Sequence, residues 1–229
     1  MDKLIEYSPL LARGAVVTVA LAVVSLALAT LLGGLAAAGR IGGGRIARGV
    51  VLTYTSIVRG IPDLVLILLV YFGGQRLLNV TLGLFGLPSV ALSPFTAGVL
   101  AIGFIYGAYL AETFRGAYMT IPKGQLEAGQ ALGLRGFPLM WKVMIPQLIR
   151  FALPGYGNVW QVLVKSTAVV SVIGLEDLVG LANDAGKTTR EPFLFLSAVM
   201  LVYLAITFVS TNVLALMERR YALVGHHAR

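Results

Sequence analysis

Long runs of apolar residues alternate with shorter polar connections along this chain of 229 residues. The first run, GAVVTVALAVVSLALATLLGGLAAA, covers residues 14–38, and the last, PFLFLSAVMLVYLAITFVSTNVLALM, covers residues 192–217. A helix that crosses a bilayer needs about 20 predominantly apolar residues. We expect further spans over residues 51–74, 95–114 and 154–173. The pattern therefore predicts an all-α membrane protein, with five transmembrane helices in a single domain.

The composition agrees with this class. Hydrophobic residues make up 58% of the chain and charged residues 12%, whereas soluble domains are about 45–50% apolar and about 25% charged. The first run is too long for the apolar part of a signal peptide, which has about 7–15 residues, so we expect it to be retained. The chain has no Cys, which excludes disulfides, thiolate metal sites and a Cys nucleophile.

Basic residues gather in the connections that follow the first, third and fifth runs. They are Arg40, Arg45 and Arg48 after the first, Arg115, Lys123, Arg135, Lys142 and Arg150 after the third, and Arg219, Arg220 and Arg229 after the fifth. Connections rich in Lys and Arg stay in the cytoplasm. We therefore expect a periplasmic N-terminus and a cytoplasmic C-terminus. This topology also explains the net charge of +8 without nucleic acid as a partner.

The longest cytoplasmic connection contains the segment KGQLEAGQALGLRGFPLMWKVMIPQ, residues 123–147. Residues 124–134 favour a helix, which Gly133 or Gly136 can end, and a second short helix is expected to start at Pro138, because proline is tolerated in a first turn. Apolar side chains would project from both helices: Leu132, Leu134, Phe137 and Trp141. The pattern fits two roles equally, a surface that docks into the groove of a soluble partner or an amphipathic connector on the lipid headgroups.

The spacing of Glu127-Ala128, Gly133 and Ile145-Pro146 resembles the EAA loop of ABC importer permeases. This resemblance implies that residues 119–150 form a coupling loop, a helix-turn-helix held in a cleft of the ATP-binding subunit. The coupling residues it implies are Glu127, Ala128, Gly129, Gly133, Leu134, Arg135, Ile145 and Pro146. One departure is Gly129, where the family usually has Ala; glycine weakens a helix by about 1 kcal/mol.

Four further segments are similar to permeases of polar amino-acid importers, including the Q-type permeases of histidine, lysine, arginine and ornithine importers. They cover residues 59–73, 103–128, 152–178 and 185–193. The resemblance implies the type I ABC importer permease fold, a bacterial inner membrane location, and transport of basic or polar amino acids by alternating access. Opine and glutamine permeases of the same family are alternatives.

The same resemblance implies several partners. They are a second permease subunit of the M type, two ATP-binding subunits, a periplasmic amino-acid-binding protein and membrane lipid. ATP and Mg would be bound by the ATP-binding subunits, so we expect no cofactor in this chain. A self-contained secondary transporter is the main competing class; it would predict internal repeats, and we find none in the sequence.

Catalysis by the chain itself is not expected. The stretch GLANDAGKTTR contains Gly-Lys-Thr, but a phosphate-binding P-loop needs a glycine at position 181, which is Leu. The only histidines, His226 and His227, are adjacent near the C-terminus, so no His triad or His metal site is available.

Ionisable and hydroxyl residues near the apolar runs are the candidates for the substrate path, because such groups in a membrane usually face protein or a cavity. They are Glu176, Asp177, Glu112, Asp63, Arg59, Lys165, Ser166 and Thr167. A cationic amino acid needs a carboxylate partner in a low-dielectric passage, and we prefer Glu176. The alternative role for Glu176 is contact with the binding protein at the periplasmic rim.

Structural roles compete with the path at Asp63 and Glu112. Asp63 follows Pro62 and can cap a helix start or, if the helix continues, pair with Arg59 four residues earlier. Otherwise an unwound turn before Pro62 lines the path, as in other broken membrane helices. Glu112 and Arg115 lie one helical turn apart and favour an ion pair. Gly103 and Gly107 form a GxxxG pair that permits close helix packing.

Overall fold

The computed structural model describes residues 2–221. The histidine pair, His226 and His227, and Arg229 lie outside the described residues. Within them the chain is helical, with no strand. The α-helices are α1 (Asp2–Gly42), α2 (Arg45–Gly60), α3 (Asp63–Leu68), α4 (Gly74–Leu84), α5 (Pro94–Thr120), α6 (Lys123–Ala131), α7 (Phe137–Leu139), α8 (Ile145–Ser166), α9 (Leu178–Thr189) and α10 (Pro192–Tyr221).

Two short π-helices join neighbouring elements without a break. Leu69–Gly73 connects α3 to α4, so that one helical run extends from Asp63 to Leu84. Met140–Met144 connects α7 to α8. A 3-10 helix, Thr167–Ile173, then follows α8 directly. The second helix expected after the Gly136 turn is therefore not short; it is the first part of the helix that ends at Ser166.

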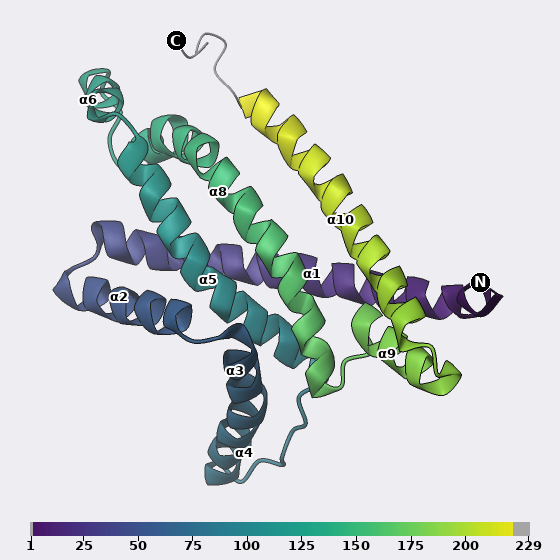
Figure 1. Cartoon of the computed structure of the whole chain (residues 1–229). Coiled ribbons are helices and arrows are strands. Elements are labelled where there is room, and N and C mark those ends of the chain that lie inside the picture. Colours follow the sequence, from purple (N-terminus) through teal and green to yellow (C-terminus); the bar gives the residue numbers. More distant parts are fainter. Residues whose placement is uncertain (1, 222–229) are drawn as a thin grey trace.

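Helices α1 and α5 form the centre of the fold, and α8 lies along α5 (Figure 1). Helices α9 and α10 cover the N-terminal part of α1, while α2 runs back beside its C-terminal part. The main core lies between α1, α5 and α8, around fully buried side chains such as Leu21, Ile105 and Leu163. A smaller core, with Leu178 and Phe195, fixes α9 and α10 against α1.

Glycines let α1 and α5 approach closely. A Cβ atom added at Gly103 would lie 2.5 Å from Cδ2 of Leu28, and one at Gly33 would lie 2.7 Å from Cβ of Leu110. At Gly107 it would lie 3.0 Å from Cβ of Leu32. The predicted packing role of Gly103 and Gly107 is confirmed, and Gly33 supplies the matching close approach from α1.

Four helical runs of the described chain are long and apolar enough to cross a membrane: Asp2–Gly42, Asp63–Leu84, Pro94–Thr120 and Pro192–Tyr221. The expected span over residues 51–74 is wrong as one helix, because α2 ends at Gly60 and Ile61 is extended, with φ −112° and ψ 139°. Proline disfavours the helical conformation in the residue before it, so Pro62 ends one helix and a new one begins at Asp63.

The expected span over residues 154–173 also has different bounds. α8 begins at Ile145 and stays α-helical only to Ser166. Pro154 lies inside it, and polar side chains such as Asn158 and Gln161 lower its hydropathy. The number of five membrane-crossing helices and the orientation of the termini stay predictions.

The contact between α1 and α5 can be tested with paired glycine substitutions. Gly103→Ala should lower the free energy of unfolding by about 1–3 kcal/mol, the usual cost of overpacking a core. Gly116→Ala is the matched control on the same helix, since an added Cβ there meets nothing within 4 Å. Thermal unfolding of both variants in detergent measures the difference, and equal melting of the two would contradict the packing role.

Candidate functional site: an exposed helical turn and a polar stripe on α5

Backbone capping ends α6 at a glycine. The N–H of Leu134 donates to the carbonyl oxygen of Gly129 (3.0 Å), and the N–H of Gly133 donates to that of Gln130 (2.9 Å). Gly133 has φ +82°, a left-handed conformation that glycine adopts without cost. This pair of hydrogen bonds is the Schellman arrangement at a helix C-terminus. Of the two glycines expected to end the helix, Gly133 does so.

Gly136 and Gly129 shape the return of the chain after α6. Gly136 also has a positive φ, +55°, directly before α7 begins. Gly129 is buried, and a Cβ atom there would lie 2.6 Å from Cδ1 of Leu139 and 3.3 Å from Cγ2 of Val143. The departure at Gly129 is therefore explained: the glycine lets α6 pack closely against the following helix.

The turn between α6 and α7 exposes large apolar side chains. Leu132 is 83% exposed, Phe137 68% and Trp141 60%. The rings of Phe137 and Trp141 stack, with centroids 6.1 Å apart and planes at 9°. We call these three residues the apolar tip. Most of the other expected coupling residues are also exposed: Glu127, Ala128, Arg135 and Pro146, with Leu134 and Ile145 half-buried.

A cluster of polar side chains lies within the core, where α3 begins. The hydroxyl of Tyr106 donates to Oδ2 of Asp63 (2.8 Å), and the hydroxyl of Ser166 donates to the same oxygen (3.0 Å). The two hydroxyl oxygens are also in contact with each other, and because each hydroxyl has a single proton, only two of these three contacts are hydrogen bonds at any moment. We call these three residues the Asp63 network. It joins the start of α3, the middle of α5 and the end of α8.

The Asp63 network corrects two structural roles expected for Asp63. The N-cap position of α3 is occupied by Pro62, and the hydrogen bonds of the Asp63 carboxylate go to Tyr106 and Ser166 in place of backbone N–H groups. The helix does not continue from Arg59 to Asp63, and among the ion pairs of residues 2–221 there is none between them. The unwound turn before Pro62 is present, at Ile61. Its place in a substrate path stays a prediction.

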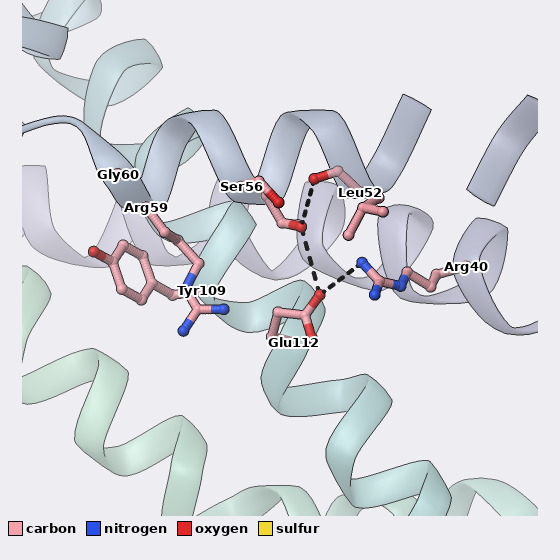
Figure 2. Close-up of a pocket in the computed structure, with 8 residues that line it drawn as sticks. Arg40, Leu52, Ser56, Arg59, Gly60, Tyr109 and Glu112 are labelled. Carbon is pink, nitrogen blue, oxygen red and sulfur yellow. Dashed lines mark hydrogen bonds and ion pairs between the residues drawn. The ribbon is translucent and has the colours of Figure 1, made fainter. Parts of the chain in front are cut away.

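Glu112 lies between two arginines. Its Oε1 accepts from Nη1 of Arg40 (3.1 Å), and its Oε2 accepts from Nε of Arg115 (2.9 Å). The predicted Glu112–Arg115 ion pair is confirmed, and Arg40 of α1 is an additional partner. The hydroxyl of Thr55 lies 3.5 Å from Oε1. Figure 2 shows Arg40 on one side of Glu112 and Arg59 on the other.

Arg59 lies beside a series of polar side chains that recur every third residue along α5. The guanidinium of Arg59 lies 5.4 Å from the ring centroid of Tyr109, and the rings of Tyr109 and Tyr106 stack at 5.5 Å. Residues 106, 109, 112 and 115 recur every third residue, so each lies next to the following one while the series turns by about 60° around the helix at each step. We call these four residues the α5 stripe. The Asp63 network lies at one end of it.

Sequence reasoning missed the part played by Tyr106, Tyr109 and Arg40. Tyrosines inside an apolar run look like ordinary core residues, although a buried hydroxyl needs a partner. The three-residue spacing of Tyr106, Tyr109, Glu112 and Arg115 is the signal that was available. In residues 2–221, no group of three His, Asp or Glu side chains is placed to hold a metal ion.

The remaining candidates lie apart from the α5 stripe. Glu176 is exposed and pairs with Nη2 of Arg13 at 3.4 Å. Lys165 is exposed and lines a separate pocket with Tyr203 of α10. The buried hydroxyl of Thr167 donates to the carbonyl oxygen of Val164 (2.7 Å) and hydrogen-bonds to the hydroxyl of Tyr203 (3.1 Å).

Asp177 has a structural role at the start of α9. Its Oδ1 accepts from the N–H of Gly180 at 2.9 Å, so the side chain caps the helix. The residue is fully buried, and its Oδ2 has no hydrogen-bond partner in the described part of the chain. Burial raises the pKa of Asp177 from 3.8 to about 6, against the lowering effect of backbone N–H groups.

This raised pKa predicts a pH dependence of stability. Since folded Asp177 binds its proton more tightly than the unfolded chain, its stabilising contribution is complete below the unfolded pKa of 3.8 and is lost as pH rises through about 6. The full change amounts to at most about 3 kcal/mol. Asp177→Asn keeps the capping oxygen and should flatten the rise in melting temperature between about pH 7 and pH 4.

Thermal unfolding in detergent across this pH range measures the effect. Asp184→Asn is the matched control, because Asp184 lies on the same helix with a 75% exposed side chain. If Asp177→Asn and wild type show the same pH profile, the buried carboxylate does not titrate as described.

Comparisons with known proteins identify the family. Residues 29–223 match the family described as binding-protein-dependent transport system inner membrane component. The histidine/lysine/arginine/ornithine transport system permease protein HisQ of Salmonella typhimurium is 45% identical over 217 residues, 95% of each chain. The octopine transport system permease protein OccQ of Rhizobium radiobacter is 40% identical over 91% of this chain and 88% of that one.

Solved structures agree with the sequence relatives. The crystal structure of an amino acid ABC transporter with histidines matches with a TM-score of 0.78 and 33% identity, over 95% of this chain and 96% of that one. An inward-facing MetNI methionine ABC transporter has a TM-score of 0.73 at 20% identity, over 95% and 99%; this match supports the fold alone. The all-helical chain with the type I ABC importer permease fold thus belongs to the family of binding-protein-dependent transport system inner membrane components.

Proposed function

We propose that this chain is the membrane-spanning permease subunit of an ATP-driven importer of polar and basic amino acids, the class of histidine, arginine, lysine and ornithine. The relatives named for histidine/lysine/arginine/ornithine and for octopine transport support this substrate class. An opine importer is the second candidate, favoured by the octopine and nopaline permeases among the relatives. The chain itself is not an enzyme in this proposal.

One structural observation carries the proposal. A helical run without a break extends from Phe137, in the apolar tip, to Ser166, in the Asp63 network. At about 1.5 Å per residue this run is about 45 Å long. In this proposal a displacement of the tip is carried along the helix to the polar residues of the core, and the π-helical turn at Met140–Met144 and Pro154 are the points at which it bends. An exposed apolar surface of this kind is suited to the groove of a soluble partner.

The partners follow from this arrangement. Two ATP-binding subunits, which hold ATP and Mg, dock on the coupling loops of a permease pair, and the second permease is a related M-type chain. A periplasmic amino-acid-binding protein delivers substrate to the outer side. Exposed Glu176 lies beside the N-terminal part of α1, and we assign it to contact with this binding protein in place of recognising a cationic substrate.

Closure of the ATP-binding subunits would move both coupling loops and rock the helices between outward-open and inward-open states. In this proposal the substrate passes the side chains near the break between α2 and α3. They are Arg59, Asp63, Glu112 and Ser166. Of the other candidates, Asp177 caps α9, Thr167 packs in the core and Lys165 lies on the surface of α8. Capping and buried hydroxyl pairs explain the first two by themselves.

Uptake measurements test the proposed function. The chain, purified with its partner subunits and reconstituted in liposomes, should import radiolabelled L-arginine only with ATP and the binding protein present. Import without ATP would favour a self-contained secondary transporter. Octopine import in place of L-arginine import would favour the second candidate.

Coupling can be separated from assembly at the α6–α7 turn. Gly133→Ala forces a left-handed backbone on a residue with a Cβ, at about 1–2 kcal/mol, which corresponds to a factor of about 5–30 in the population of the native turn. ATP-driven uptake should fall by up to that factor while the amount of protein in the membrane is unchanged. Gly124→Ala is the matched control, since Gly124 lies in α6 with open space around it and no positive φ. Equal uptake by both variants would contradict the coupling role.

A further inference from the structure

A polar pocket opens beside the break between α2 and α3 (Figure 2). Its cavity volume is about 490 Å³, within the range of about 300–1,000 Å³ that is usual for small-ligand sites. Arg40 of α1, Ser56 and Arg59 of α2, and Tyr109 and Glu112 of the α5 stripe line it. The pocket therefore combines three helices, aromatic surface and several charges in one place.

The acidic group of this pocket is already occupied. Oε1 of Glu112 accepts from Arg40, and Oε2 accepts from Arg115. A carboxylate that has two guanidinium partners gains little from a further cation. Glu112 is thus poorly suited to bind the positive side chain of a basic amino acid.

Arg59 is in the opposite situation. Among residues 2–221, no carboxylate lies within ion-pair distance of its guanidinium. Its plane is held near the ring of Tyr109, an attraction that orients a guanidinium without using its N–H donors. Arg59 therefore presents a positioned set of donors to the cavity.

The charges add to a positive site. Three guanidinium groups, those of Arg40, Arg59 and Arg115, surround the single carboxylate of Glu112. The C-terminus of α2 adds about half a negative charge, which leaves the balance positive. A guanidinium fork matches planar oxyanions in geometry, above all carboxylate and phosphate. The pocket thus suits an anionic oxygen group better than a cation.

We propose that Arg59 binds the carboxylate group of the transported amino acid in this pocket. The inference rests on the proposed function, and it names the part of the substrate that is recognised. Every α-amino acid carries this carboxylate, so one arginine can bind each member of the class, whatever its side chain. The stacked rings of Tyr109 and Tyr106 connect the pocket to the Asp63 network. That network includes Ser166 at the end of α8, so substrate bound in the pocket can shift the end of this helix.

A lipid phosphate presents the same chemistry as the carboxylate. The position of the pocket favours the substrate, because Arg59 lies in the last turn of α2, next to the interruption of the helix, and interrupted membrane helices line transport paths. Arg59 is itself exposed, as are Arg45 and Arg48 at the start of α2, so a lipid phosphate competes for the same guanidinium and is distinguished from the substrate by experiment.

Binding measurements with two ligands test this inference. The chain, purified with its partner subunits and placed in phosphatidylcholine nanodiscs without the binding protein, is titrated with radiolabelled L-arginine and with L-argininamide, in which the carboxylate is a neutral amide. Arg59→Gln should weaken L-arginine binding about tenfold or more, the effect of losing a charged hydrogen-bonding partner. Its effect on L-argininamide should be less than about twofold, because that ligand lacks the carboxylate.

Two further variants keep the test informative. Arg59→Lys retains the charge but not the planar fork, so its affinity for L-arginine should lie between those of wild type and Arg59→Gln. Arg48→Gln removes an exposed arginine from the same helix and should leave L-arginine binding unchanged. If Arg59→Gln does not fold, the comparison of Arg59→Lys with Arg48→Gln decides. Equal affinity of Arg59→Gln and wild type for L-arginine, or equal losses for both ligands, overturns the inference.

Lipid is distinguished in the same preparations. Phosphatidylglycerol is added to the nanodiscs, and the lipid retained after purification is measured by mass spectrometry. Loss of retained phosphatidylglycerol in Arg59→Gln with unchanged L-arginine affinity would assign the pocket to a lipid phosphate and overturn the inference. Absence of any ATP-driven amino-acid uptake by wild type would refute the proposed function itself. Normal uptake with an unaffected Arg59→Gln variant refutes only the carboxylate site.

Discussion

Charged and hydroxyl side chains set among apolar helices must find their partners within the protein, because lipid offers them none. This constraint shapes the centre of the fold. Asp63 is placed where α3 begins, and the hydroxyls of Tyr106 and Ser166 satisfy one of its oxygens. Glu112 is held by Arg40 and Arg115. Each of these groups joins at least two helices, so the polar contacts fix how α1, α2, α3, α5 and α8 meet.

The break between α2 and α3 and the long helix ending in α8 meet at the same place. Ser166 is the last α-helical residue of α8 and also a partner of Asp63. A movement of the apolar tip would thus reach the residue that holds the start of α3. In the proposed function this link needs no moving loop inside the membrane, because a continuous helix supplies it. Close packing of α1 on α5 through glycines provides the firm support against which α8 can move.

The sequence predicted what depends on local rules. Apolar length indicated the membrane class, a glycine between two helix-favouring segments indicated the end of α6, and the spacing of Glu112 and Arg115 indicated an ion pair. Contacts between residues far apart in the chain could not be predicted from the sequence. No local sequence pattern shows that Ser166 hydrogen-bonds to Asp63, or that Arg13 forms an ion pair with Glu176. A proline in an apolar run is compatible with a kink or a break, and the extended conformation of Ile61 shows that the chain takes the break.

Crosslinking at the apolar tip tests most directly whether it meets an ATP-binding subunit. The absence of native Cys means that a single introduced thiol reports one position only. Leu132→Cys, at the 83% exposed tip, is compared with Val209→Cys, on an exposed face of α10, each treated with a short bifunctional reagent in native membranes. We predict that Leu132→Cys alone forms an adduct containing a P-loop ATPase, identified by peptide sequencing. The absence of that ATPase from the Leu132→Cys adduct, or its equal recovery with Val209→Cys, would contradict the account.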